Sequence, residues 1–268
     1  MRTLVLYVFH EYNDRVDYFI KNAIFKQQGT DFVVICNDPI LEFDVPDYVG
    51  ILKRSNHGHD FGGWSHALFH NDIYKTYDRF IFANSSVMGP YLPPGYTGRW
   101  TDVYLNGLKN GVKLFGSTIN CQFFLRQDIP LALHPIVFSH LQSYIFAMDL
   151  ETLEYLIKCD IFSIMNHSDV FLKTIENKEV GMSRKIIENG WNIGCLMPRY
   201  KDIDFRFIYK KPQDYGIQFL GDIMFPEYVD KVFTPEELVF VKGNRCPQIP
   251  LPNIYYNNTN GDELVETL

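Results

Sequence analysis

The sequence predicts an α/β fold with a mostly parallel central sheet, on three observations. The apolar, β-branched run Thr3–Phe9 is typical of a strand buried on both faces. Residues 14–28 carry apolar side chains at helical spacing and are followed by Gly29, and residues 32–36 form a second apolar run. A strand–helix–strand start implies a right-handed crossover, with ligand-binding loops at the carboxyl ends of the strands.

The rest of the chain continues this alternation. We expect further strands at residues 49–53, 77–83, 112–117, 143–148 and 191–197, and helices at residues 61–70, 150–159 and 179–189. Residues 89–99 contain three prolines and three glycines and are expected to be a loop. We predict one main domain, residues 1–200, and a C-terminal extension, residues 201–268, in which six prolines interrupt the pattern and a polar tail begins at about residue 257.

The composition excludes several classes of protein. Hydrophobic residues make up 46% and charged residues 21%, as in folded soluble proteins, and no apolar run is long enough for a membrane span. The net charge of −7, without a long basic run, disfavours nucleic acid as a partner. The aromatic share of 16% fits an aromatic core or a sugar-binding cleft.

The five cysteines are widely spaced and form no Cys-x-x-Cys pair, so neither a zinc site nor a disulfide framework is indicated. We expect reduced, mostly buried thiols. The apolar N-terminal segment is too short for a signal peptide. Together these features favour a cytoplasmic protein.

The first polar motif, residues 55–64, lies between an expected strand and an expected helix. Its glycines would let a ligand approach the backbone, Asn56 and Asp60 can hydrogen-bond a sugar or base, and helix amides favour a diphosphate. Two alternatives stay open. The motif can be a turn capped by Asp60, or His57, His59 and Asp60 can be metal ligands of a metallohydrolase, although the other histidines are scattered.

The second motif follows the expected strand at residues 77–83 and reads Asn84-Ser85-Ser86. Nucleotide-sugar transferases with such a sheet usually carry two carboxylates here, which hold a divalent cation against the diphosphate. Because this turn has no carboxylate, either other residues bind a metal or cationic side chains replace it. The metal ligands are unknown, and we expect at most a weak dependence on Mn²⁺ or Mg²⁺.

Two cations in the C-terminal extension are candidates for that replacement. Lys242 and Arg245 follow a short helix expected after Thr234, and both could fold back and neutralise a leaving diphosphate. The alternative is a pair of solvated surface cations.

The third motif begins with Glu179, at the expected start of the helix that ends before Gly190. A carboxylate there can simply interact with the helix dipole. It can also act as a general base that removes a proton from an acceptor hydroxyl.

Four segments in this order resemble the rhamnan synthesis protein F family of glycosyltransferases. They are residues 59–64, residues 80–90, residues 140–144, and residues 179–183 with Gly190, and the match extends over about residues 1–200. The resemblance implies a GT-A type fold, in a single Rossmann-like domain. It also implies transfer from a nucleotide-activated sugar, often a deoxyhexose such as rhamnose, during polysaccharide assembly.

On this basis we assign expected roles to the polar residues. The donor side is expected to comprise His10, Asn56, His59, Asp60, Asn84, Ser85, Ser86, Lys242 and Arg245. The acceptor side is expected to comprise His140, Gln142, Ser143 and Asp149. Glu179 would correspond to the catalytic carboxylate of related inverting transferases. The family usually has Asn-Asp-Ser where this chain has Asn84-Ser85-Ser86, and the missing acid puts metal dependence in doubt.

The sequence therefore predicts an inverting glycosyltransferase that takes a UDP- or dTDP-sugar as donor and a glycan as acceptor. Glu179 is the expected base, with Asp60 and Asp149 as the next candidates. The main alternative is a protein of the same fold that binds a nucleotide sugar or a carbohydrate without turnover, which the missing acid at Ser85 makes conceivable.

Overall fold

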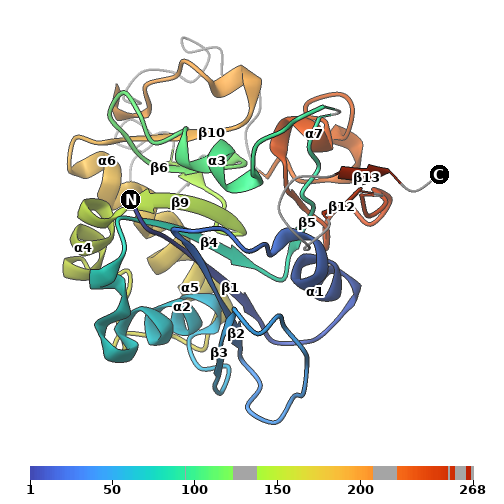
Figure 1. The fold of residues 1–268 in the computed structure, drawn as a ribbon. Helices are drawn as coiled ribbons and strands as arrows, with labels where there is room; N and C mark the ends of the chain where they lie inside the picture. Colours follow the sequence, from blue (N-terminus) through green and yellow to red (C-terminus); the bar gives the residue numbers. More distant parts are fainter. Residues whose placement is uncertain (94, 123–137, 208–221, 253, 257–263, 267–268) are drawn as a thin grey trace.

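A seven-stranded sheet forms the centre of the computed structural model (Figure 1). The structure describes residues 1–93, 95–122, 138–207, 222–252, 254–256 and 264–266. The strand order is β10-β6-β9-β4-β1-β2-β3, and β9 is the one strand of this sheet that runs against the others. The expected mixed α/β fold with a mostly parallel sheet is confirmed.

The strands of the central sheet are β1 Thr3–Phe9, β2 Thr30–Cys36, β3 Gly50–Lys53, β4 Arg79–Asn84, β6 Val112–Gly116, β9 Ile145–Asp149 and β10 Asn192–Cys195. Three two-stranded sheets accompany it: β5 Val87–Met88 with β11 Val241–Lys242, β7 Ile119–Gln122 with β8 Phe138–Leu141, and β12 Ile254–Tyr256 with β13 Leu264–Glu266. All seven strands of the central sheet overlap strands expected from the sequence. The pairs β7–β8, β5–β11 and β12–β13 were not expected.

The α-helices are α1 Asp14–Tyr18, α2 His59–Phe69, α3 Trp100–Leu105, α4 Leu150–Lys158, α5 Phe171–Thr174, α6 Gly181–Glu188 and α7 Pro235–Leu238. Two π-helical turns extend them, η1 Phe19–Ala23 after α1 and η4 Ile175–Val180 between α5 and α6. Short 3-10 turns are η2 His70–Thr76, η5 Pro198–Tyr200, η6 Phe205–Phe207 and η8 Pro226–Tyr228.

Two expectations about helix ends were wrong. The first helix ends at Ala23, well before Gly29, because the chain turns to an extended conformation at Ile24. The helix expected from residue 179 already begins at Phe171, since α5, η4 and α6 follow one another without a break. Glu179 therefore lies inside this long helix and not at its N-terminus.

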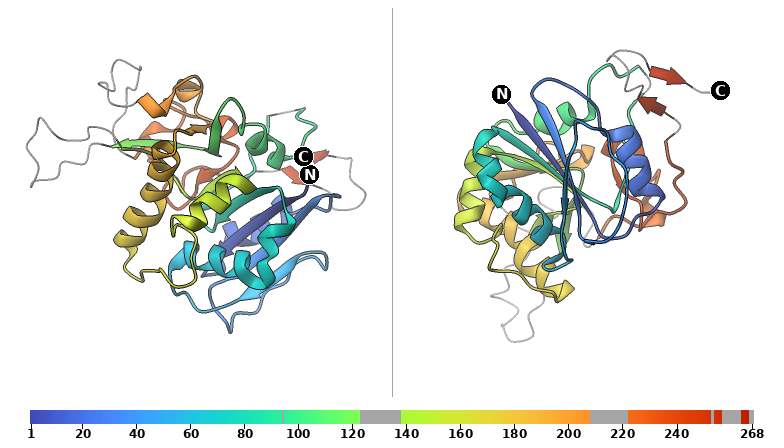
Figure 2. Two further views of the ribbon diagram at one scale, coloured as in Figure 1. Left: turned by 90° about the vertical axis from the view of Figure 1, so that its left-hand side faces the viewer. Right: turned by 60° about the horizontal axis from the view of Figure 1, so that its bottom comes forward.

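The sheet lies between two layers (Figure 2). Helices α2, α4 and α6 cover one face, while α1, α3 and the C-terminal segment lie on the other. Each layer packs through aromatic side chains. On the α2 side the rings of Trp64, Phe82 and Phe146 contact one another, and on the α1 side Trp100 packs against Phe19 and Phe240. The aromatic-rich composition thus supplies core packing on both faces of the sheet.

The five cysteines are all free thiols, and four of them are buried, as the sequence indicated. Within the described part of the chain, no helix combines the length and the apolar composition needed to cross a membrane. Most of the expected polar tail, residues 257–263 and 267–268, lies outside the described residues. Its residues 264–266 form β13, so the tail is not uniformly irregular.

Candidate functional site

Most of the polar residues singled out in the sequence lie where strands β1, β2 and β4 end. We call this row of carboxyl strand ends the edge. These three strands run parallel, so the residues that follow them are neighbours in space. The edge carries the loop after β1, the loop before α2 and the turn after β4. Open α/β sheets bind their ligands in this position.

Asn37, at the end of β2, joins three of the expected donor residues. Its side-chain amide donates to Asn56 Oδ1 at 3.1 Å and to the carbonyl of His59 at 3.1 Å. Its backbone carbonyl lies 3.0 Å from His10 Nδ1, and its Oδ1 accepts from Arg54 at 2.9 Å. Asn37 is buried and was not identified from the sequence, although a polar residue directly after a buried strand was a usable signal.

The loop before α2 is held by Asp169, which is distant in the chain and lies just before α5. Its carboxylate accepts from Gly58 N at 2.8 Å and lies 2.8 Å from His57 Nδ1, while its carbonyl lies 3.2 Å from His59 Nε2. Gly58 and His59 both have positive φ, +73° and +52°, so the chain makes a left-handed turn into the helix. The N-cap residue of α2 is Gly58, so the alternative in which Asp60 caps this turn does not hold.

The adjacent glycines Gly62 and Gly63 allow α2 to pack closely, and they do not open the backbone to a ligand. A Cβ on Gly63 would lie 2.8 Å from Val8 Cγ2, and one on Gly62 would lie 2.1 Å from the carbonyl of His57. Both residues therefore bring α2 close to the sheet and to its own N-terminal loop. This corrects the interpretation that the glycines open the backbone to a ligand.

Asp60 and Asn84 meet at the centre of the edge. Asn84 Nδ2 donates to Asp60 Oδ2 at 2.8 Å, and Asn84 Oδ1 accepts from Ser86 N at 2.9 Å. Burial raises the pKa of Asp60 to about 6, against the lowering effect of the Asn84 hydrogen bond and of the charges on His59 and Lys242. The charge on Glu179 raises the pKa further, so the two carboxylates lie within electrostatic reach of each other.

The C-terminal segment folds back on the turn after β4, which was one of the two alternatives considered for Lys242 and Arg245. Strand β11 pairs with β5, with Lys242 opposite Val87, and Gly243 N donates to the carbonyl of Ser86 at 2.7 Å. Lys242 acts electrostatically on Asp60 and has no ion-pair partner in the described part of the chain. Arg245 is exposed and lies over the ring of Phe225 at 5.3 Å, so it does not share this position.

A second cation, Arg15, lies beside the same turn. Its Nε donates to the carbonyl of Ser85 at 3.2 Å, and a Cβ on Gly243 would lie 2.7 Å from its Cδ. Arg15 was not identified from the sequence. The signal was its place in the first turn of α1, where the helix dipole disfavours a cation.

Glu179 faces this edge from within η4. Its Oε2 accepts from Ser143 N at 2.8 Å and from the Ser143 hydroxyl, and its Oε1 lies 3.8 Å from His140 Nε2. The Glu179 side chain is 13% exposed. Three of the expected site residues, Glu179, His140 and Ser143, thus form one cluster, and the carboxylate is not a helix-dipole residue.

Gln142 is buried beside this cluster, but its amide is already used. Its Oε1 accepts from Thr118 at 2.8 Å and its Nε2 donates to Asp222 at 3.2 Å. Asp149 does not join the cluster at all. It pairs with Arg79 across β9 and β4, at the opposite edge of the sheet, where it caps α4 and binds Lys113 at 2.7 Å.

No group of three or more His, Cys, Asp or Glu side chains arranged to hold a metal ion occurs among the residues described. His57 and His59 instead contact Asp169, so the metallohydrolase alternative gains no support from this loop. The site offers two carboxylates, Asp60 and Glu179, and two cations, Arg15 and Lys242, around the Asn84 turn.

The fold and this edge define a mixed α/β protein whose polar residues gather at the carboxyl ends of parallel strands. The family model of rhamnan synthesis protein F matches residues 33–221, and the chain belongs to that family. Comparison with curated proteins finds no match. Among solved structures, the chain is similar to 2-C-methyl-D-erythritol 4-phosphate cytidylyltransferase of Francisella tularensis, with 12% identity and a TM-score of 0.41 over 81% of this chain and 97% of that one.

Proposed function

We propose that this protein is a GT-A type glycosyltransferase that moves a sugar, such as rhamnose, from a UDP- or dTDP-sugar to a glycan, with inversion. The observation that carries the proposal is the convergence of Asp60, Asn84 and Glu179 at one strand edge in a member of a rhamnan synthesis family. A cytoplasmic location is part of the proposal, and the five free thiols support it.

On the donor side, the diphosphate would bind at the turn Asn84–Ser86. Arg15 and Lys242 flank this turn, and both retain hydrogen-bond donors for phosphate oxygens. Charge-assisted hydrogen bonds from such cations stabilise the negative charge that develops on a leaving diphosphate. They would supply the positive charge that the family's usual acid, absent at Ser85, recruits through a metal.

On the acceptor side, Glu179 is the proposed base. Ser143 already donates twice to Oε2, which leaves Oε1 to accept the proton of an acceptor hydroxyl. As that proton moves to Glu179, the acceptor oxygen bonds to the anomeric carbon and the bond from that carbon to the diphosphate oxygen breaks. The acceptor oxygen supplies the electron pair of the new bond, the pair of the broken bond stays on the diphosphate oxygen, and the nucleoside diphosphate leaves toward Arg15 and Lys242.

Glu179→Gln tests the base. The amide keeps the volume of the side chain but cannot accept a proton, so transfer should fall by about 10²–10⁴-fold, the usual contribution of a general base. Binding of the donor should change little, since Glu179 lies on the acceptor side. Near-wild-type transfer by this variant would remove Glu179 from the role, and Asp60 would be the next residue to test.

Donor hydrolysis separates the enzyme from a protein that only binds. Without acceptor, an active transferase slowly releases nucleoside diphosphate from its correct donor, because water can take the place of the acceptor hydroxyl. A binding protein would retain the intact donor. A thermal-shift screen of nucleotide sugars would first identify the donor, since a ligand that binds the native state raises its apparent stability.

A further inference from the structure

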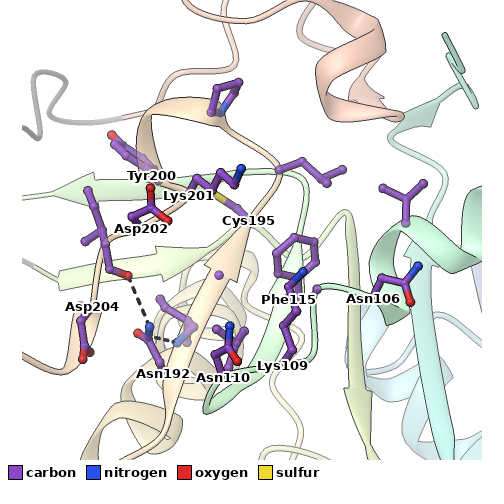
Figure 3. A pocket seen from close by; sticks show the side chains of 18 of the residues that line it. Asn106, Lys109, Asn110, Phe115, Asn192, Cys195, Tyr200, Lys201, Asp202 and Asp204 are labelled. Atoms are coloured by element: carbon purple, nitrogen blue, oxygen red, sulfur yellow. Dashed lines mark hydrogen bonds between the residues drawn. The ribbon is translucent and has the colours of Figure 1, made fainter.

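A second recess lies on the other half of the sheet, away from the Asn84 turn. Its volume is about 680 Å³, within the range of pockets that hold small ligands. Its walls come from two segments that are distant in the sequence, the connection from α3 to β6 and the residues that follow β10 (Figure 3). The proposed transfer chemistry does not use it.

The floor of the recess is built around one aromatic ring. Phe115, on β6, is half-buried and lies between two glycines that leave room for it. A Cβ on Gly107 would lie 2.3 Å from the ring, and one on Gly194 would lie 2.9 Å from Cδ2. Side chains at either glycine would displace the ring, so this part of the sheet is shaped to keep an aromatic surface in the recess.

One wall is fixed by a local irregularity of the sheet. The pairing of β10 with β6 shifts register between Asn192 and Ile193, as in a β-bulge. The buried Asn192 side chain then donates to the carbonyl of Ile203 at 3.3 Å and accepts from Phe205 N at 2.9 Å. These bonds hold the segment after β10 in place, so the recess is preformed.

The rim carries hydrogen-bond donors and acceptors, and its charged side chains are of both signs. Lys109, Asn110, Lys201 and Asp202 are exposed, and in the described part of the chain their side chains make no hydrogen bond or ion pair. Mixed donors and acceptors suit sugar hydroxyls, each of which can donate and accept. Asp204 is already paired with Arg206, which also lines the recess, so Asp202 is the acid among the exposed rim groups named above.

One end of the recess, at Leu196 after β10, lies at the strand ends that hold the proposed reaction centre, whereas Lys109 and Asn110 lie before β6 at the opposite ends. Backbone hydrogen bonds at this edge link Asn84 to Tyr144 at 3.0 Å, Gln142 to Thr118 at 3.1 Å, and Leu196 to Gly116 at 3.0 Å. Leu196 lines the recess. Strands β4 and β10 are three positions apart in the sheet, which corresponds to about 14 Å at the usual strand spacing. A chain of several sugars can span that distance.

We propose that this recess binds a neutral segment of the acceptor glycan, away from the sugar that is being extended. An aromatic floor with a polar rim matches the apolar face and the hydroxyls of a sugar ring. That the bound glycan is the acceptor rests on the proposed transferase function, whereas the binding of a neutral glycan at this recess does not.

The test measures binding of rhamnan oligosaccharides of increasing length by isothermal titration. The double variant K201A/D202A removes rim groups that are exposed, and F115L removes the ring while keeping an apolar floor. The matched control is K158A/E154A, which removes one exposed cation and one exposed acid from α4 on the opposite face. Thermal melts check that each variant is folded.

We expect the long oligosaccharide to bind the wild type about tenfold more tightly than a disaccharide, and this gain to disappear in both recess variants but not in the control. Donor hydrolysis without acceptor should be unchanged. Equal binding of the long oligosaccharide by wild type and recess variants would overturn the proposal, as would binding of inorganic diphosphate that is lost in K201A/D202A. If the wild type shows this length-dependent binding but neither transfers sugar nor hydrolyses donor, the second site stands and the transferase function fails.

Discussion

Asp60 carries a charge that the fold makes costly. Burial raises its pKa from the ordinary 3.8 to about 6, so the native state holds a proton that the unfolded chain releases between these two values. The free energy of unfolding should therefore decrease as the pH rises from about 4 to about 6 and then stay level.

Replacing Asp60 with a neutral residue should restore the free energy of unfolding that its ionisation removes. We expect D60N to be more stable than the wild type by about 1–2 kcal/mol at pH 7.5, after allowance for the partial exposure of the side chain, and equally stable near pH 4. Urea unfolding at a series of pH values measures the difference. D47N changes an exposed carboxylate and serves as control. A stability gain for D60N that persisted unchanged at pH 4 would argue against the proposed cause.

Arg15 is expected to act on the donor diphosphate. R15A removes a guanidinium from the Ser85 turn and should weaken binding of the nucleoside diphosphate about tenfold or more, since hydrogen bonds to charged groups contribute roughly 1.5–3 kcal/mol. Its effect should shrink at high salt. The control is K21A, which removes an exposed cation from the following turn. If both variants bind the diphosphate equally well, Arg15 has no role in donor binding.

The left-handed turn into α2 leads to a prediction about the stability of two glycine variants. Gly58 has φ +73°, and a Cβ there would lie 2.7 Å from the ring of His167. Gly190 has φ +77°, but a Cβ there would meet nothing within 4 Å. G58A and G190A should share the cost of a left-handed alanine, about 1–2 kcal/mol, and G58A should lose about 1–3 kcal/mol more through overpacking. Chemical unfolding measures both, and equal losses would show that His167 moves aside freely.

The long helix α5–η4–α6 shows why the place of Glu179 within a helix could not be predicted from the local sequence pattern. Glu179 looked like a helix-start residue because the apolar periodicity is clear only after it. The preceding turns expose two large apolar side chains, Phe171 and Leu172, and include a π-helical turn, which does not follow the usual period. That turn places Glu179 against Ser143 and His140, a contact that no local pattern encodes.

At the scale of the whole molecule, we expect the turn after β4 to decide how strongly transfer depends on a metal. Arg15 and Lys242 reach it from opposite ends of the chain, so we expect transfer to keep most of its rate after chelation of divalent metals. S85D restores the family's usual acid and should make the activity more dependent on Mn²⁺. Assays with and without chelator, on wild type and S85D, test this. Complete loss of wild-type transfer on chelation, restored by Mn²⁺, would contradict it.

The sequence by itself determined the strands of the central sheet, the α/β class and most of the polar residues of the edge, because a buried strand and the turn that follows it are consecutive in the chain. It could not determine which way a strand runs. Since β9 is antiparallel, its end at Asp149 lies at the far edge of the sheet, and the residues before it, His140 and Ser143, reach the site instead. Only the tertiary structure placed Arg15 beside Ser85 and decided that Lys242, and not Arg245, lies at this turn, because these contacts join segments that are distant in the chain.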